Sequence, residues 1–480
     1  MLEQKTTLKF YNTLTNRVDD FKAIDEAHKT VTMYSCGPTV YSYAHIGNFR
    51  AYVFMDVLRR VLKYNGYKIN GVMNITDVGH LTDDNDSGED KMELTAKKEN
   101  KSPYEVAKFY AEQFFIDAKK LNIGMPEHIA YATGHVEDMI AFVKGILDNG
   151  YAYEVNGNVY FDVEKYNEKF SNKYGELSGL NLKDQMAGAR IEVNAEKKSP
   201  YDFALWIKAP KEHIMKWDSP WGLGYPGWHI ECSAMGKKYL GNRFDIHTGG
   251  VDHIPVHHEN EIAQSRGLTC DADHTQANFW MHCEFLKVDN GKMSKSLGNV
   301  YTINDLETNG YSALDYRYFL LNANFKKSQN FTWEALDAAK NARHNLIELL
   351  FEHKHAGVVG NDIDVSRFLK AINGDLNIPL ALSFVWELLN SSQKQINKYT
   401  AVIQMDKILG LSLEEEVEKL EAEQNKEQII PAEVKKLAEE RWQAKAQKNW
   451  VLADELRKKL TDMGYNIKDA KDTYEIEVIK

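Results

Sequence analysis

The chain of 480 residues is too long for one domain, and its composition, 43% hydrophobic and 27% charged, is typical of folded rather than disordered or fibrous protein. A net charge of −11, from 70 acidic and 59 basic residues, excludes indiscriminate coating of nucleic acid but not a local basic surface that binds it. Four cysteines exclude a disulfide framework, and the sequence contains neither an apolar signal core nor a long apolar run. We therefore expect a cytoplasmic protein with free thiols and no membrane contact.

The N-terminal part of the sequence predicts a strand, a helix and a second strand. Residues 31–34 are a short apolar run followed by a Gly-Pro turn, and residues 69–75 form a second run. Between them, valine, phenylalanine and leucine recur at helical spacing over residues 48–65. This order is that of the parallel βαβ unit. Its ligand-binding residues lie at the carboxyl ends of the strands, where Cys36 and Asp77 fall.

The pattern of strands is then interrupted and resumes later. Residues 135–221 are rich in glycine, asparagine and lysine with short β-like runs, which predicts an inserted domain. Residues 244–247 predict a strand that ends at Gly249 and Gly250, and residues 279–288 predict one further strand. We therefore expect an α/β fold with a Rossmann-like parallel-sheet core split by an insertion.

The C-terminal third is predicted to be helical. Alanine, leucine and lysine recur at helical spacing over residues 333–410, and the acidic run at 414–427 is a linker or a solvated helix. Residues 431–470 carry nine Lys or Arg against seven Asp or Glu, together with Trp442 and Trp450. A slightly basic tail with two tryptophans suits a small module that contacts nucleic acid.

Two cysteines and a histidine–glutamate pair suggest a metal site. His257 and Glu261 are four residues apart and share one face of a helix, but His258 and Glu261, at a spacing of three, do so as well. Spacing alone does not choose between the two histidines. With Cys36 and Cys232 the group offers two thiolates, an imidazole and a carboxylate, all of which zinc accepts. The alternative is that both cysteines are small buried hydrophobes and that the His/Glu pair is a solvated helix face.

Two short motifs are typical of sites that bind nucleotides. In the first, at residues 45–48 (HIGN), the glycine lets a nucleotide approach the backbone and the start of the helix faces phosphate. For a lone tetrapeptide of this kind, a histidine in an ordinary turn is the commoner explanation. In the second, at residues 292–296 (KMSKS), Lys292 and Lys295 follow a predicted strand and can bind a polyphosphate as its charge shifts in the transition state. The alternative is an exposed polar loop.

Together these motifs resemble the class I aminoacyl-tRNA synthetases, and the more detailed match is to the cysteinyl-tRNA synthetase family. The segments that carry the resemblance are 36–41 (CGPTVY), 74–77 (NITD), 227–235 (GWHIECSAM), 257–264 (HHENEIAQ), 292–299 (KMSKSLGN) and 448–454 (KNWVLAD). The resemblance covers nearly the whole chain. One departure is Asn48, where the family commonly has a histidine. Asparagine can donate a hydrogen bond to phosphate but cannot carry charge.

The resemblance implies a site for each small substrate. It selects His257 over His258 and implies one Zn²⁺ per chain, with the thiolate of L-cysteine as an additional ligand, and Mg²⁺ would accompany ATP. The implied zinc ligands are Cys36, Cys232, His257 and Glu261. The residues implied for ATP are His45, Gly47, Asn48, Gly249, Gly250, Asp252, Lys292 and Lys295. Those with an implied catalytic role are Lys295, Lys292, His45 and Asn48. The residues implied for the amino acid are Gly37, Thr76, Trp228 and His247.

The resemblance also implies an activity and a division of the chain. The family forms cysteinyl-adenylate and pyrophosphate from L-cysteine and ATP, and then transfers cysteine to the terminal adenosine of tRNA(Cys). We expect the same reaction here, by a monomer. The expected parts are a core first half at 1–134, an inserted connective domain at 135–221, a core second half at 222–290, a stem-contact region with the lysine motif at 291–332, a helical bundle at 333–412, an acidic linker at 413–430 and an anticodon-binding module at 431–480.

Two other functions share part of these features. A ligase that joins cysteine to an amino sugar would have the same active site, but it would lack the helical tail that residues 430–480 supply. A zinc-stabilised RNA-binding protein descended from a synthetase would be expected to lose the lysine motif, which is intact here.

Overall fold

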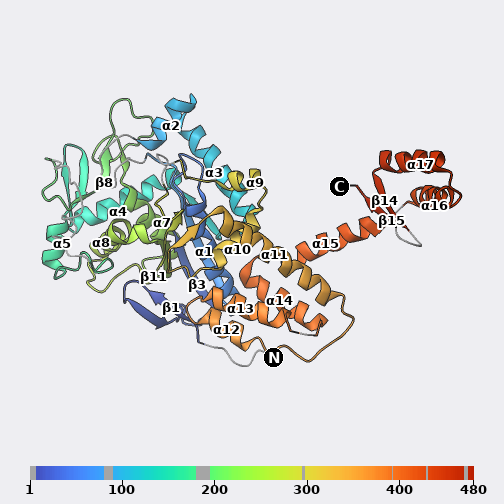
Figure 1. Cartoon of the computed structure of the whole chain (residues 1–480). Helices are drawn as coiled ribbons and strands as arrows, with labels where there is room; N and C mark the ends of the chain where they lie inside the picture. Colours follow the sequence, from blue (N-terminus) through green and yellow to red (C-terminus); the bar gives the residue numbers. More distant parts are fainter. Residues whose placement is uncertain are drawn as a thin grey trace.

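The computed structural model describes residues 7–79, 90–179, 195–293, 298–391, 393–428, 431–469 and 474–479, apart from the side chains of 425–428 and 478. Its centre is a five-stranded sheet in the order β11-β10-β3-β4-β5, in which every pair of neighbours is parallel (Figure 1). The strands are β3 (Thr30–Ser35), β4 (Lys68–Ile75), β5 (His128–Tyr131), β10 (Phe244–Gly250) and β11 (Ala277–Cys283). The predicted Rossmann-like core is confirmed.

Helices cover both faces of this sheet. Val31 and Met33 of β3 belong to the same apolar cluster as Val53 of the first helix, whereas Tyr34 belongs to a second cluster with Met235. Because alternate side chains of a strand point to opposite faces, β3 packs against apolar clusters on both faces, although Thr30, Thr32 and Ser35 are polar. The helices concerned are α1 (Ile46–Tyr64) on one face, and α4 (Val136–Asp148) and α7 (Trp228–Leu240) on the other.

A second sheet lies to one side of the core (Figure 1). Its four strands are antiparallel in the order β6-β7-β8-β9. They are β6 (Ala152–Val155), β7 (Asn158–Phe161), β8 (Phe203–Lys208) and β9 (Gly224–Pro226), with α5 (Val163–Lys169) between β7 and β8 in the chain. α7 follows β9 directly in the chain. The antiparallel sheet therefore lies, in sequence, between the first and second halves of the core.

The single strand predicted over residues 279–288 is wrong. β11 ends in the core sheet, and the chain then turns before β12 (Leu286–Val288) pairs in parallel with β13 (Gln329–Phe331) in a separate two-stranded sheet. The turn is fixed because the backbone N–H of Glu284 donates to the carbonyl of Phe325 at 2.8 Å. The lysine motif therefore follows β12 and not a strand of the core sheet.

The C-terminal third is helical, as predicted, and the acidic run is a helix rather than an unstructured linker. Arg317 joins this region to the core: its Nη2 lies 2.6 Å from Asp56 Oδ2 of α1, and its Nε donates to the carbonyl of Leu409 at 2.8 Å. Both charged groups are buried, and their pairing offsets the cost of removing them from water. The helices are α9 (Ile303–Thr308), α10 (Ala313–Leu321), α11 (Trp333–Lys354), α12 (Ser366–Asn373), α13 (Ile378–Leu389), α14 (Ile396–Leu409) and α15 (Leu413–Gln428).

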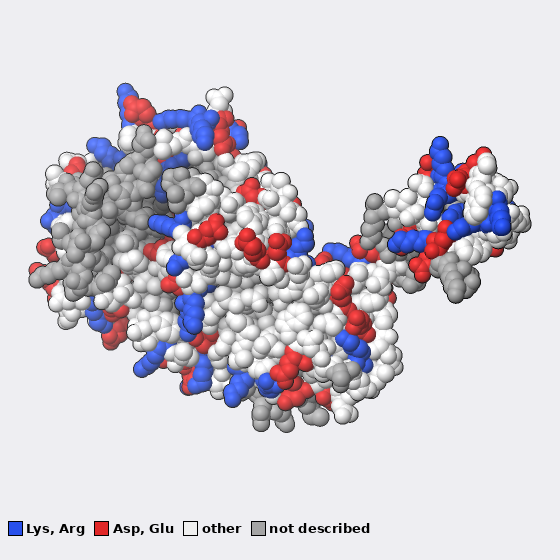
Figure 2. All heavy atoms as spheres, viewed as in Figure 1, with Lys and Arg blue, Asp and Glu red and all other residues white. Residues whose placement is uncertain are grey.

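The last residues form a small module that stands apart from the body at the end of α15 (Figure 1). It has its own apolar core of Val434, Ala438, Leu460 and Ile467. Its elements are α16 (Ala432–Ala446), α17 (Trp450–Asp462), β14 (Tyr465–Asp469) and β15 (Tyr474–Val478). On the face drawn in Figure 2, Lys and Arg side chains of the module are interspersed with Asp and Glu.

The remaining elements lie at the edges of the core or around the site. They are β1 (Lys9–Asn12), β2 (Arg17–Asp20), α2 (Lys91–Glu99), α3 (Pro103–Lys120), the 3-10 turns η1 (Ala132–His135) and η2 (Val251–His253), the π-turn η3 (Ile254–His258) and α8 (Glu259–Thr269). Among the described residues, no helix combines the length and the apolar character needed to cross a membrane.

Candidate active site

The four predicted zinc ligands meet at the carboxyl edge of the core sheet. Cys36 directly follows β3, Cys232 lies in the first half of α7, His257 lies in η3 and Glu261 lies in the first turn of α8. One ligand atom from each lies within 4.8 Å of the ligand atoms of the others. Cys36 is the least buried of the four residues, and the other three are buried.

The chemistry of these side chains fits zinc. Two sulfurs, one imidazole nitrogen and one carboxylate oxygen are a usual zinc set, and four is the usual number. Among the described residues, the buried Oε1 of Glu261 has no hydrogen-bond partner, although it lies 3.0 Å from His257 Nε2. A buried carboxylate oxygen without a hydrogen bond is costly, and a bound cation would satisfy it.

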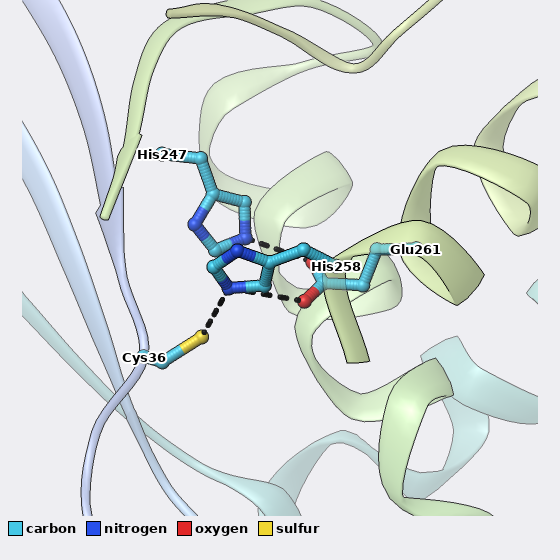
Figure 3. A group of neighbouring side chains, drawn as sticks. All are labelled: Cys36, His247, His258 and Glu261. Carbon is cyan, nitrogen blue, oxygen red and sulfur yellow. Dashed lines mark hydrogen bonds and ion pairs between the residues drawn. The ribbon is translucent and has the colours of Figure 1, made fainter. Parts of the chain in front are cut away.

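A second group of four shares two of these residues (Figure 3). In it, His247 and His258 take the places of Cys232 and His257 beside Cys36 and Glu261. His258 Nε2 lies 3.2 Å from Cys36 Sγ, and His247 Nε2 lies 2.8 Å from Glu261 Oε2. The structure thus brings both histidines that the spacing left open to the same cluster.

Further buried histidines surround the cluster and were not singled out in the sequence. His258 Nδ1 lies 2.7 Å from His282 Nε2, and His282 Nδ1 lies 2.7 Å from Thr13 Oγ1. On the other side, His229 Nδ1 lies 2.9 Å from His257 Nδ1. These partners orient the rings of the candidate ligands, as outer partners of metal-bound histidines do. No sequence spacing links His282 or Thr13 to the cluster, because the sheet alone brings them there.

The charges of the cluster favour the deprotonated form of two candidate ligands, Cys232 and Glu261, while, against the opposing effect of burial, Glu261 and Cys232 raise the pKa of His257 to about 10. Burial by itself raises the pKa of the Cys232 thiol, but the hydrogen bond with Cys36 and the nearby His257 outweigh it and lower that pKa to about 6. Burial and the same hydrogen bond raise the pKa of Cys36. Burial also raises the pKa of Glu261, but His247 and His257 outweigh it and lower it to about 2. Cys232 and Glu261 therefore favour the anionic form, which is the form that binds zinc.

The two nucleotide-type motifs lie side by side, although they are far apart in sequence. Ile46 N donates to the carbonyl of Tyr301 at 2.8 Å, just after the lysine loop. A Cβ on Gly47 would lie 3.3 Å from Met293 Cε within that loop. Lys292 is exposed, and Lys295 lies in residues 294–297, outside the described part of the chain.

The first motif is held by a reciprocal cap at the start of α1. His45 Nδ1 accepts from the backbone N–H of Asn48, and Asn48 Oδ1 accepts from the backbone N–H of His45. Because Nδ1 accepts, the neutral imidazole carries its proton on Nε2. Asn48 is exposed, and its carbonyl oxygen is used in the cap.

The residues predicted for the amino acid and adenosine lie around the cluster. The Trp228 ring stacks on His257 with centroids 4.2 Å apart. His247 is fully buried behind Glu261. Gly37 follows Cys36, and a Cβ on it would collide with the backbone carbonyl of Asn74, so only glycine fits there. Of the residues predicted for the adenosine, Gly249 and Gly250 end β10, and the exposed Asp252 lies in η2.

Comparison with known proteins gives the family. A family profile described as tRNA synthetases class I (C) catalytic domain matches residues 22–341. The chain is 45% identical over 491 residues to a cysteine–tRNA ligase of Treponema denticola, with 96% of this chain and 98% of the relative covered. It is 43% identical over 473 residues to cysteine–tRNA ligase 1 of Burkholderia lata, with 97% and 96% covered. The chain belongs to the cysteine–tRNA ligase family.

A solved structure supports the same fold for this family member. The methionyl-tRNA synthetase of Mycobacterium tuberculosis in complex with methionyl-adenylate matches with a TM-score of 0.54, over 81% of this chain and 91% of that one. The sequence identity is 14%, so this likeness concerns the fold alone. It agrees with the parallel core described above.

The candidate site contains one further buried acid, Glu231. Glu231 directly precedes Cys232, and its Oε2 accepts from Thr76 Oγ1 at 2.6 Å. Its Oε1 is buried and has no hydrogen-bond partner among the described residues. Burial raises the pKa of Glu231, and the bond from Thr76 opposes that shift. The only sequence signal is its place inside the segment 227–235.

Proposed function

We propose that this chain is the cysteine–tRNA ligase of its organism. It would activate L-cysteine with ATP, release pyrophosphate, and transfer the cysteinyl group from the adenylate to the 3′ terminal adenosine of tRNA(Cys). The observation that carries the proposal is the meeting of Cys36, Cys232, His257 and Glu261 beside the two joined nucleotide motifs, in a chain that matches cysteine–tRNA ligases over nearly its full length.

The proposed zinc ligands are Cys36, Cys232, His257 and Glu261. Zinc held there would lower the pKa of the substrate thiol and would bind a thiolate far better than a hydroxyl. Serine is nearly isosteric with cysteine, so shape alone would discriminate weakly between the two. A substrate sulfur would approach beside Cys36, the least buried of the four ligands. Selection of cysteine would therefore rest on sulfur chemistry more than on the size of the pocket.

The amino-acid pocket is proposed around the rest of this edge. Trp228 would form its wall, Gly37 would let the substrate approach the backbone, and Thr76 would bind a polar group of the amino acid. His247 would act through Glu261, to which it is hydrogen-bonded. Together these residues would orient the substrate, so that its carboxylate faces ATP while its sulfur stays at the cluster.

ATP is proposed to bind between the two motifs. His45 would donate from Nε2 to a phosphate, and the N–H groups at the start of α1 would add their partial positive charge. Gly249, Gly250 and Asp252 would hold the adenosine. Lys292 and Lys295 would neutralise the charge that develops on the leaving pyrophosphate, and Mg²⁺ would bind the ATP phosphates.

The other proposed partner is tRNA. The stem-contact region at 291–332 would hold the acceptor stem, and the module at 431–480 would contact the anticodon. The module stands at the end of α15, away from the cluster, which suits a substrate that spans two distant sites (Figure 1). The expected monomer and cytoplasmic location belong to the same proposal, as does the division of the chain into the parts given above.

Amino-acid-dependent pyrophosphate exchange with all twenty amino acids tests the function. We expect exchange with cysteine and background with serine. Exchange with another amino acid, or with none, would contradict the proposal. The amino-sugar ligase shares cysteine activation, so it is separated by whether labelled cysteine reaches tRNA. A non-enzymatic RNA-binding protein would give neither reaction.

A further inference from the structure

A chain of hydrogen bonds links the two cysteines of the cluster through residues that are not metal ligands. Gly37, next to Cys36, donates its N–H to Asn74 Oδ1 at 2.8 Å. Asn74 Nδ2 donates to Thr76 Oγ1 at 3.1 Å. Thr76 Oγ1 then donates to Oε2 of Glu231, the neighbour of Cys232, at 2.6 Å. Asn74, Thr76 and Glu231 are all buried.

The direction of each bond is forced. Because Asn74 Oδ1 accepts from a backbone N–H, its amide nitrogen must face Thr76, and that nitrogen can only donate. The Thr76 oxygen therefore accepts from Asn74, and its single hydrogen goes to Glu231. This assignment holds whether or not Glu231 is ionised, because a proton on the carboxyl can sit on Oε1, which has no hydrogen-bond partner among the described residues.

The backbone of Thr76 is also fixed. Thr76 N donates to the carbonyl of Pro38 at 3.1 Å, and the Thr76 carbonyl accepts from Val40 N at 3.2 Å. A hydroxyl has one hydrogen and two lone pairs. Glu231 accepts the hydrogen and Asn74 donates to one lone pair, so one lone pair of Thr76 Oγ1 remains. Thr76 is thus set to accept a hydrogen bond and cannot donate one.

We propose that Glu231 is a positioning residue that fixes the Thr76 hydroxyl as an acceptor for the α-ammonium group of the amino acid. This deepens the proposed function and rests on it. With the substrate sulfur at the cluster, its ammonium group is only two carbons away, beside the strand end that carries Thr76. A hydroxyl that can only accept favours an ammonium group over a carboxylate, which would need a donor. The chain of hydrogen bonds would therefore determine the orientation of the ammonium and carboxylate groups of bound cysteine.

Substitution of Glu231 separates this role from a structural one. Glu231→Met removes the acceptor, and Glu231→Asp keeps a carboxyl group but shortens the reach. Both should raise KM for L-cysteine in pyrophosphate exchange by roughly 10- to 100-fold, because the ammonium group loses its oriented acceptor. Glu231→Gln keeps an acceptor oxygen at the same reach and should largely restore KM. Inhibition by mercaptopropionate, which has the thiol and carboxylate but no amino group, should not change in any variant.

Two further variants complete the test. In a double-mutant cycle, Thr76→Val with Glu231→Met should be no worse than Thr76→Val alone, because Glu231 acts through Thr76. Glu127→Met is the matched control. Glu127 accepts from Gly71 N at 2.8 Å on β4, the strand that ends just before Thr76, but lies away from the cluster, so KM for cysteine should stay unchanged. Zinc content is measured in every variant, and Glu231→Asp carries the test if Glu231→Met fails to fold.

Three results would overturn the inference. They are an unchanged KM for cysteine in both Glu231→Met and Glu231→Asp, an equal loss of mercaptopropionate binding, or a Gln variant as defective as the Met variant. The proposed function fails differently, because then the unsubstituted chain would show no cysteine-dependent exchange at all.

Discussion

His45 and Asn48 cap the first core helix reciprocally. The backbone N–H of Asn48 donates to His45 Nδ1 at 3.2 Å, and the backbone N–H of His45 donates to Asn48 Oδ1 at 3.0 Å. The position at which this chain departs from its family thus has a definite structural role. Asn48 orients the imidazole that is proposed to face ATP, which gives an asparagine a use that does not require charge.

Asn48→Ala should slow adenylate formation by about 10-fold, because losing one half of such a cap costs about 0.5–2 kcal/mol and releases His45. Asn48→Asp keeps the cap but places a negative charge near the phosphates, so it should mainly weaken ATP binding. Single-turnover adenylate formation with varied ATP separates the two. Asn65→Ala, at the other end of α1, is the control and should leave the rate unchanged. A normal rate for Asn48→Ala would show that the cap does not matter for catalysis.

The purified protein should contain about one zinc per chain, and Cys232→Ala should lose most of it. Cys270→Ala is the matched control, since Cys270 is exposed and outside the cluster. Elemental analysis measures the metal, and cobalt substitution reports on the sulfur ligands by their charge-transfer absorption. Full zinc in Cys232→Ala, together with its loss in His258→Ala, would mean that the group with His247 and His258 holds the metal instead. A fully active, metal-free enzyme would contradict both arrangements.

Lys295→Ala should reduce kcat for adenylate formation by about 100-fold or more, comparable with losing one preorganised donor, while ground-state ATP binding changes much less. Lys292→Ala should have a similar or somewhat smaller effect. Lys287→Ala is the control, because Lys287 is exposed on β12 just before the loop. Pre-steady-state adenylate formation is the measurement. An unchanged rate constant with only weaker ATP binding would remove the transition-state role from Lys295.

Removal of the chain after α15 should leave cysteine-dependent pyrophosphate exchange largely intact. The reason is that the C-terminal module has a separate apolar core, whereas Leu413 and Val417 of α15 are buried in the body. Charging of tRNA should be lost, or its KM for tRNA should rise, because the proposed anticodon contact is gone. If the shortened enzyme charges tRNA normally, the module has another role.

Much of the core could be predicted because its signals are local. Residues 48–65 are predicted to be helical, and α1 runs Ile46–Tyr64; its start is set by His45, a residue type that sequence rules do not favour as a cap. The parallel strands on either side follow from short apolar runs bounded by turns. The end of β11 could not be predicted, because the break before β12 depends on a bond from Glu284 to Phe325, which lies in a distant part of the chain.

The candidate site also contains residues that the sequence predicts and residues that only the fold reveals. Cys36, Cys232 and Glu261 stand in conspicuous sequence settings, and the fold brings them together. Spacing could not choose between His257 and His258, because both lie in the π-turn η3 and both approach the cluster. His282, Thr13 and Glu231 were missed, because their contacts arise from strand order and helix packing rather than from any motif.

The central claim is that this chain attaches cysteine to tRNA(Cys). The most direct test is to incubate the purified enzyme with ATP, labelled cysteine and unfractionated tRNA, and to identify the charged tRNA. We expect ATP-dependent labelling of tRNA(Cys) alone, with no charging when labelled serine replaces cysteine. Transfer of the label to an amino sugar, charging of a different tRNA, or comparable charging with serine would contradict it.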